Sequence, residues 1–365
     1  MPALLLSTHG LRPHGRLLVR VTAPEWQVDA ASEDAADRPE VQRRATIAAS
    51  EGATVLLGAS EPAADRSSAV AGEVIAMSAE PKRVDFAVEA AVAIAATYGV
   101  VSTRPKVMHH SNNVVVHLAP AAVVAKVATL KKGEQAGAST ARELAVARFL
   151  AERNAPMVPP TTILPAGPHS ADGLELGFWT YCRHDVNDEL DGRAAGRSLA
   201  ALHKALEGYP TELPPFAAQV EHAAAVLADE PLPALPRDDR AFLADLLERL
   251  SARLDTTSLS ARPLHGEVHL GNLLAGAEGL RWIDFEAACT GPLEWDLTGL
   301  PDAGVEVFDH VDSSLLALLR EVRSCCVAAW CWRNPERAPE LREAAELHLA
   351  RLRRRHGRRS RGIDV

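Results

Sequence analysis

The chain has 365 residues, and none of its apolar runs is long enough to cross a membrane. The richest apolar stretch, Ala87 to Val101, is interrupted by Glu89 and is typical of a buried helix. The first ten residues lack lysine and arginine, and their apolar run is short, so we expect no secretory signal. These patterns favour a cytoplasmic protein without a membrane partner.

Cysteine is scarce, and its pattern excludes two kinds of site. The five cysteines are an odd number in a long chain, which argues against a disulfide framework and favours a reducing compartment. Three of them fall in the apolar stretch CCVAAWCW without a CxxC pair or a nearby histidine, so we expect core cysteines there instead of a zinc site. The five are Cys182, Cys289, Cys325, Cys326 and Cys331.

The chain has no general excess of positive charge, because its net charge is −9. The last fifteen residues, 351–365, carry seven arginines and one aspartate, a net +6 that leaves −15 on the rest. An acidic body argues against nucleic acid as the main ligand and is compatible with a cationic substrate. The basic tail is most simply a solvated end, and the alternative is a contact with RNA or anionic lipid.

Hydrophobic periodicity divides the legible part of the chain into a strand-rich half and a helix-rich half. In the first half the patterns predict helices over 85–98 and 139–153, and strands over 106–109, 113–118, 122–128 and 177–183. In the second half they predict helices over 194–206, 217–228, 240–254 and from 313 onward, with short strands near 264–286. This order predicts an α+β fold with two segregated lobes, a small β-rich N-lobe and a larger, mainly helical C-lobe.

Residues 1–82 have weak periodicity, and they predict only a strand over 15–23 and a helix over 41–50. We therefore predict an N-terminal extension of unassigned fold, partly disordered, over 1–82. The N-lobe is predicted over 83–182, the C-lobe over 183–350 and the basic tail over 351–365.

The segment from Leu264 to Leu297 carries the chemistry that the sequence indicates. Glu267 is followed five positions later by Asn272 and twelve positions after that by Asp284, each beside a short apolar run. A strand pair would bring the ends of those runs together. Carboxylate and amide oxygens are ligands that Mg²⁺ takes together with water and phosphate oxygens.

The same segment resembles the aminoglycoside phosphotransferases and their relatives, the choline and methylthioribose kinases. His265, Gly266 and Asn272 match their motif His-Gly-Asp-x-x-x-x-Asn, and residues 283–286 match Ile-Asp-Phe-Glu. Residues 291–297 resemble the Gly-Pro-x-x-x-Asp-Leu segment that follows. The resemblance spans about 84–351 and implies a protein-kinase-like fold and the transfer of phosphate from Mg·ATP to a hydroxyl group.

The resemblance implies roles for residues of the second half. Glu267 stands where the family has its catalytic aspartate, which orients the substrate hydroxyl and accepts its proton. Asn272 and Asp284 would hold Mg²⁺ against the ATP phosphates. His265 would brace the catalytic loop, and Asp296 would position the segment after the metal loop.

The first half would then supply the nucleotide clamp. Lys126 lies in the middle of an apolar strand and would grip the α- and β-phosphates, with Glu143 on the following helix as its partner. The alternatives are an outward-facing lysine and a solvated glutamate. Residues 110–113 resemble a phosphate loop without its usual glycine, in which Ser111 and Asn112 would donate to phosphate. Residues 177–183 would form the hinge beside adenine.

One departure from the family motif leaves a second function open. Glu267 is one methylene longer than aspartate, and catalytic positioning is sensitive at about 1 Å. Either the loop is set back and the enzyme works, or the chain is a nucleotide-binding pseudoenzyme with a regulatory role. A third reading is an adaptor that binds through the arginine tail.

The acceptor is the least determined part of the prediction. In the resembling family it is chosen by the helical insert, here about 217–254, and by the C-terminal helices. Aminoglycoside, sugar, amino-alcohol and macrolide acceptors all fit the sequence. Acidic residues that would suit an amine are Asp185, Asp188, Glu189 and Asp191.

Overall fold

The computed structural model describes most of the chain from residue 67 onward and five short strands before it. The described ranges are 5–8, 16–18, 21–22, 27–30, 56–58, 67–130, 133–184, 190–229, 231–255, 257 and 259–357, with side chains described from residue 82 on, except at 133, 134 and 255. The chain divides into two compact units, Met1–Lys82 and Arg83–Val365.

The smaller unit contains two small sheets. One has the order β1-β4-β3, built from Leu5–Thr8, Gln27–Ala30 and Val21–Thr22, and the other pairs β2 (Arg16–Leu18) with β5 (Leu56–Gly58). The predicted strand over 15–23 is therefore two strands, β2 and β3. The helix predicted over 41–50 lies outside the described residues.

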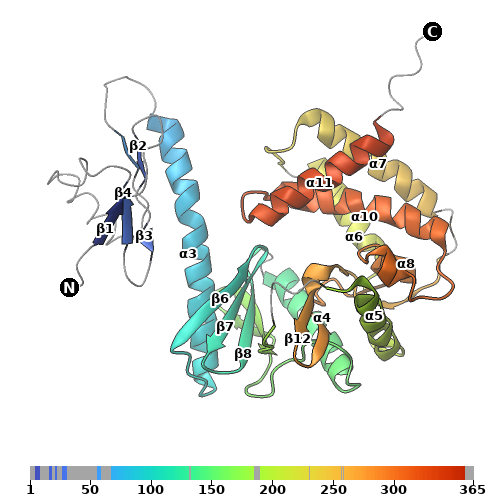
Figure 1. Ribbon diagram of the computed structural model, residues 1–365, viewed down its shortest axis with the longest axis horizontal. Coiled ribbons are helices and arrows are strands. Elements are labelled where there is room, and N and C mark those ends of the chain that lie inside the picture. Colours follow the sequence, from blue (N-terminus) through green and yellow to red (C-terminus); the bar gives the residue numbers. More distant parts are fainter. Residues whose placement is uncertain are drawn as a thin grey trace, which may run out of the picture. The chain divides into compact units, whose positions relative to one another are not determined.

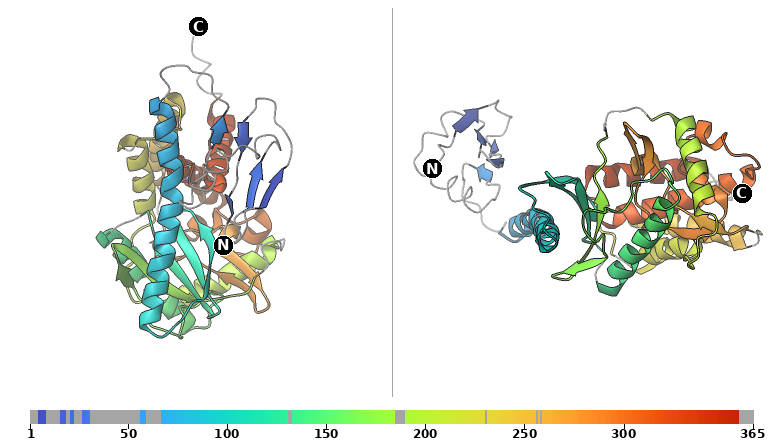
Figure 2. Two further views of the ribbon diagram at one scale, coloured as in Figure 1. Left: turned by 90° about the vertical axis from the view of Figure 1, so that its left-hand side faces the viewer. Right: turned by 90° about the horizontal axis from the view of Figure 1, so that it is seen from below.

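Helix α3 (Ser67–Thr97) starts well before the predicted position, 85. Its first half is rich in alanine, a strong helix former, but lacks the spacing of apolar and polar residues that indicates a helix. Four alanines of its second half, Ala87, Ala90, Ala91 and Ala95, are at most 4 % exposed and pack against the sheet of the larger unit. Small side chains let this half of the helix lie close to the strands, and the left-hand view of Figure 2 shows it beside them.

The N-lobe sheet is antiparallel and has the order β6-β7-β8-β10-β9. Its strands are β6 (Arg104–His110), β7 (Asn113–Ala119), β8 (Val123–Ala128), β9 (His169–Ala171) and β10 (Leu174–Thr180). Alternate residues of β7 and β8 are buried on the face that α3 covers. Helix α4 (Gly133–Ala151) contacts β10 and starts before the predicted 139. The prediction began too late because glycines, here at 133 and 137, are typical of a loop.

The C-lobe is mainly helical, and Figure 1 shows α6, α7, α10 and α11 gathered together. Its helices are α5 (Gly192–Leu206), α6 (Ala217–Asp229), α7 (Arg237–Asp255), α8 (Leu293–Leu297), α9 (Asp302–Val305), α10 (Ser313–Arg333) and α11 (Pro339–His356), with a 3₁₀ turn over Leu270–Asn272. The motifs lie beside two antiparallel strand pairs. These are β11 (Arg262–Leu264) with β14 (Cys289–Gly291), and the hairpin of β12 (Leu273–Gly276) with β13 (Gly279–Trp282).

Two apolar cores pack around the elements that carry the motifs. One joins α6, α7, α10 and α11, and the other joins α4, α5 and the segments around the motifs. The cysteines predicted to be core residues are buried at 325, 326 and 331. Helix α11 continues to His356, so the first six residues of the predicted basic tail are helical. The search for membrane-spanning helices covered the described residues and found no helix long and apolar enough.

Candidate functional site

Lys126 of β8 points away from the α3 side of the sheet. Its neighbours in the strand, Ala125 and Val127, are buried on the α3 face, and the alternation of a strand places Lys126 on the other face. There its Nζ donates to both carboxylate oxygens of Glu143, at 2.9 and 3.0 Å. The Lys126 side chain is 13 % exposed, and its ammonium is paired with the anionic partner that the sequence predicted for a mid-strand lysine.

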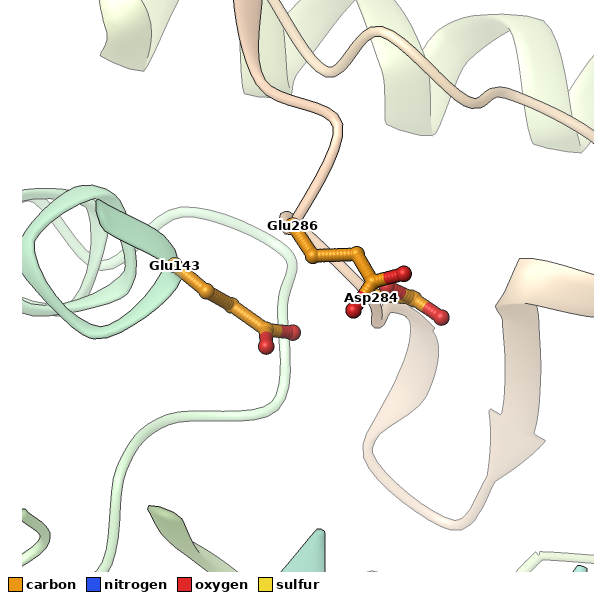
Figure 3. A group of neighbouring side chains, drawn as sticks. All are labelled: Glu143, Asp284 and Glu286. Atoms are coloured by element: carbon orange, nitrogen blue, oxygen red, sulfur yellow. The ribbon is translucent and has the colours of Figure 1, made fainter. Parts of the chain in front are cut away.

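Three carboxylates surround this ammonium, and they come from both lobes. Lys126 Nζ lies 2.8 Å from Asp284 Oδ1 and 3.5 Å from Glu286 Oε2. Figure 3 shows Glu143 reaching from α4 toward Asp284 and Glu286, which lie together after β13. One oxygen of each carboxylate lies within 4.8 Å of the others, so the three form a candidate cation site. Asp284 has a φ of 68°, an uncommon backbone conformation for a residue other than glycine.

The protonation of the cluster is decided by a balance between burial and ion pairing. Burial raises the pKa of Glu143 to about 7, and Lys126 opposes this rise. Burial would also raise the pKa of Asp284, but Lys126 overcomes it and holds that pKa below its ordinary value. The pKa of Lys126 stays above its ordinary value because Asp284, Glu143 and Glu286 outweigh its burial.

The catalytic segment predicted from the His-Gly motif leaves β11 and is held by one buried aspartate. Asp296 accepts from the backbone N–H of His265 and of Gly266, both at 2.8 Å. His203 Nε2 donates to the same carboxylate at 2.8 Å, and this hydrogen bond helps hold the pKa of Asp296 low despite its burial. Asp296 therefore holds the loop that precedes the metal motif. The role predicted for it was to position the segment after that motif.

His265 itself is fully buried and faces inward. Burial lowers the pKa of His265, which makes the neutral ring the stable form. Its Nε2–H donates to the backbone oxygen of Ile283 at 3.0 Å, and its Nδ1 accepts from the backbone N–H of Glu267. The ring thus ties the loop of Glu267 to the strand that leads to Asp284, which is the bracing contact expected from the sequence.

The predicted base and the predicted amide ligand also lie together. Asn272 is 7 % exposed, and its Nδ2 donates to the backbone oxygen of Glu267 at 2.9 Å, which leaves Oδ1 as the atom that can bind a metal. Burial and the charge of Asp284 raise the pKa of Glu267 to about 7, and Arg323 opposes the rise. A carboxylate with a pKa near neutrality can accept a proton efficiently.

The two predicted phosphate-loop residues make their contacts outside the Lys126 cluster. Ser111 Oγ pairs with His109 Nε2 at 2.9 Å, and the backbone oxygen of Asn112 accepts from Thr129 and Leu130. Neither side chain joins the Lys126 cluster. The next residue, Asn113, does so by donating from Nδ2 to Glu286 at 3.2 Å.

Sequence reasoning missed three contributors to this cluster. Asn113 and Glu286 line the small cavity beside Lys126, together with Thr140 of α4 and Trp179 of β10. Arg142, the neighbour of Glu143 on α4, donates to the backbone oxygen of Glu286 at 2.9 Å. Two of them left a signal in the sequence, Asn113 as the last residue of the stretch 110–113 that resembles a phosphate loop, and Glu286 as the last letter of the Ile-Asp-Phe-Glu motif.

The acidic residues suggested for an amine acceptor receive little structural support. Asp191 accepts from the backbone N–H of Arg193 and caps the start of α5. The other three candidates, Asp185, Asp188 and Glu189, lie outside the described residues. The predicted hinge strand over 177–183 is β10, which ends at Thr180.

The chain is similar to known proteins in sequence pattern and in fold. The model of the phosphotransferase enzyme family matches residues 109–322. Similar solved structures include an amicoumacin kinase in complex with AMP-PNP, Ca²⁺ and its antibiotic, with 11% identity, a TM-score of 0.54, and coverage of 69% of this chain and 88% of that one. A spectinomycin phosphotransferase with ADP and spectinomycin has 14% identity, a TM-score of 0.51, and coverage of 72% and 93%.

A choline/ethanolamine kinase family protein from Mesorhizobium loti has 17% identity, a TM-score of 0.50, and coverage of 74% of this chain and 94% of that one. None of the curated proteins matches the chain. At these identities the solved structures establish the fold, so the predicted two-lobed, protein-kinase-like α+β architecture is confirmed. With a family model that matches more than half of its length, the chain belongs to the phosphotransferase enzyme family.

Proposed function

We propose that the chain is a small-molecule kinase that transfers the γ-phosphoryl group of Mg·ATP to a hydroxyl group. The observation that carries this proposal is the joint contact of Lys126 with Glu143 and Asp284, at 2.9 and 2.8 Å. It joins the N-lobe strand, the N-lobe helix and the metal motif of the C-lobe at one point. Family membership supports phosphotransfer, and this contact supports the choice of residues.

The donor atoms of the site fit Mg²⁺. Asp284 and Glu286 offer carboxylate oxygens, and Asn272 presents its Oδ1 from the neighbouring turn. Hard oxygen ligands with room for phosphate oxygens are the set that this ion takes in kinases. When bound, Mg²⁺ would neutralise the charge that develops on the phosphates during transfer.

The residues of the chain have separate tasks in the proposed reaction. Lys126 orients the α- and β-phosphates through its ammonium, and Glu143 holds that ammonium in place. Glu267 orients the acceptor hydroxyl and accepts its proton as the new O–P bond forms and the bond to ADP breaks. His265 and Asp296 keep the loop of Glu267 fixed while this happens. Ser111 and Asn112 remain candidates for backbone contact with phosphate.

Glu267 was the reason to consider a pseudoenzyme, and no observation favours that alternative. Its carboxylate is retained in a braced loop, and its pKa of about 7 suits proton transfer. The adaptor reading also lacks support, because Arg353 and Arg355 of the basic segment pair with Asp239 and Glu321. The acceptor is a small molecule of the aminoglycoside, sugar or amino-alcohol type in this proposal.

The first test is the release of ADP from Mg·ATP by the purified protein. It is run against aminoglycosides, macrolides, sugars and amino alcohols, for the wild type, Asp284→Ala and Asp302→Ala. Asp302 is an exposed aspartate that pairs with Arg320 and serves as the matched control. We expect turnover that is lost in Asp284→Ala and on addition of EDTA, and kept in Asp302→Ala. Turnover that survives in Asp284→Ala, or no detectable binding of Mg·ATP by the wild type, would contradict the proposal.

A further inference from the structure

The backbone oxygen of Gly266 is the most heavily bonded atom of the candidate catalytic loop. It accepts from Arg323 Nη1 at 2.9 Å, from Gln219 Nε2 at 3.3 Å and from Trp295 Nε1 at 3.3 Å. This oxygen belongs to the peptide that joins Gly266 to Glu267. The N–H of the same peptide, which is that of Glu267, donates to His265 Nδ1 at 3.3 Å, so the peptide is held at both ends.

The position of Gly266 leaves no space for a side chain. Gly266 has a φ of 84°, and a Cβ placed there would come within 1.9 Å of the backbone oxygen of Ala287. The loop therefore packs directly on the segment that follows Asp284. Gln219 Nε2 also reaches that segment, at 3.2 Å from the oxygen of Ala287 and 3.6 Å from Cys289 Sγ.

Arg323 is itself held in one place. It is 9 % exposed on α10, its guanidinium lies 4.9 Å from the ring centroid of Trp295 and 5.7 Å from that of Trp330, and its Nη1 also donates to Gln219 Oε1 at 3.1 Å. Stacking on indole rings stabilises a guanidinium and restricts its motion. Among the described residues, no carboxylate forms an ion pair with Arg323, so ion pairing does not explain this buried charge.

We infer that Arg323 and Gln219 are positioning residues that set the position of the Glu267 carboxylate. Glutamate is longer than aspartate by one carbon–carbon bond, about 1.5 Å. A loop that served aspartate would bring the longer carboxylate too far forward unless its backbone were set back. The two side chains hold the Gly266–Glu267 peptide against α6 and α10, and in this inference that contact is what accommodates the longer arm.

Gln219 lies on α6 and Arg323 lies on α10 of the same lobe. A change in the spacing of these two helices would therefore move Glu267.

The test compares Arg323→Met and Gln219→Met with Arg320→Met, a matched control one turn earlier on α10 whose arginine pairs with exposed Asp302. The inference rests on the proposed function, so turnover is measured with the best acceptor of the panel. We expect kcat to fall about 10- to 100-fold in the first two variants, with the KM for ATP within about twofold of the wild type. Arg323→Lys should recover part of the loss, because an ammonium can reach the same oxygen.

The coupling to Glu267 is tested by combining Arg323→Met with Glu267→Asp. We expect the Arg323 substitution to cost at least threefold less in the Glu267→Asp background, because the shorter arm does not need the loop held back. Equal losses in both backgrounds, or a wild-type kcat in Arg323→Met, would overturn the inference.

A second readout does not depend on turnover. Hydrogen exchange of the backbone amides over 264–270 should be at least tenfold faster in Arg323→Met and Gln219→Met than in the wild type and Arg320→Met. If the wild type shows no binding of Mg·ATP but exchange responds in this way, the proposed function fails and the bracing of the loop stands. Unchanged exchange overturns the inference whatever the activity, and circular dichroism identifies a variant that fails to fold.

Discussion

At the scale of single residues, the site is organised around one ammonium. Lys126 contacts a carboxylate of α4 and two carboxylates of the metal motif, and no single pair accounts for its position. Each carboxylate alone would be costly to bury in its charged form. Together they keep the lysine charged, and the lysine keeps Asp284 charged, so the cluster is stable only as a whole.

Removal of the ammonium should therefore reveal the repulsion among the acids. In Lys126→Met, the pKa values of Glu143 and Asp284 should rise in the folded state, because the charge of Lys126 lowers both. A carboxylate whose folded pKa is raised favours folding below its unfolded pKa, near 4, and this contribution is lost as the pH rises through the folded pKa. We expect a loss on the order of 3 kcal/mol at pH 8 and a smaller loss at pH 5.5, measured by urea unfolding.

The control is Lys106→Met, which removes an exposed lysine from β6 of the same sheet. It should leave the unfolding free energy within about 0.5 kcal/mol of the wild type at both pH values. An equal loss at pH 5.5 and pH 8 in Lys126→Met would show that lost packing is responsible, and not repulsion among the carboxylates.

Residue-level prediction from the sequence is possible where a local pattern exists. Lys126 stands out as a charge inside an apolar strand, and Asp284 stands inside a motif. Arg323 gave no such signal, because its partner Gly266 is 57 positions away and α10 is apolar on most of its surface. Asn113 and Glu286 are 173 positions apart, and only the folded chain shows that they meet.

At the scale of elements, helix starts were the least predictable feature. The spacing of apolar residues identifies a helix that has one buried face, such as α5. Helix α10 is buried on several sides, and the first half of α3 is alanine-rich without a clear face. For these helices, packing against neighbours determines the structure, and a single sequence does not report it.

Helix α11 carries a titratable side chain that makes its docking sensitive to pH. Burial, together with the nearby charges of Arg351 and Arg323, lowers the pKa of His348 to about 4. The unfolded chain takes up a proton near pH 6.5 and the folded chain only near pH 4. Stability is therefore greatest above pH 6.5 and is lost as the pH falls from about 6.5 to 4.

His348→Gln should remove this part of the pH dependence. Between pH 7.5 and pH 5, the urea midpoint of the variant should fall less than that of the wild type. His109→Gln, on an exposed strand end, serves as the control and should keep the wild-type slope. Parallel curves for wild type and His348→Gln would show that the docking of α11 does not discriminate against the charged ring.

At the scale of the whole molecule, the candidate site is contained in one unit. The two-lobed order was predictable, because strand and helix patterns change once along the chain. The fold of residues 1–82 was not predictable, since their composition lacks a clear period. Every residue given a role in the proposed reaction lies between Ser111 and Arg323, inside the unit Arg83–Val365.

Truncation separates the contribution of α3 from that of the smaller unit. A chain of residues 82–365 begins just after Pro81, where the lack of a backbone N–H already interrupts the hydrogen bonds of α3. It keeps Ala87, Ala90, Ala91 and Ala95, which cover the sheet. We expect it to fold, and to bind Mg·ATP within about twofold of the full chain in isothermal titration calorimetry.

A chain of residues 101–365 should behave differently, although it keeps every candidate site residue. Without α3, the buried face of the sheet, which includes Val114, Val116 and Leu118, would be exposed to water. We expect this chain to aggregate or to unfold in the N-lobe, and to lose Mg·ATP binding. Equal binding by the two truncated chains would show that the sheet does not need its helical cover. Loss of binding by the 82–365 chain would assign part of the site to residues 1–81.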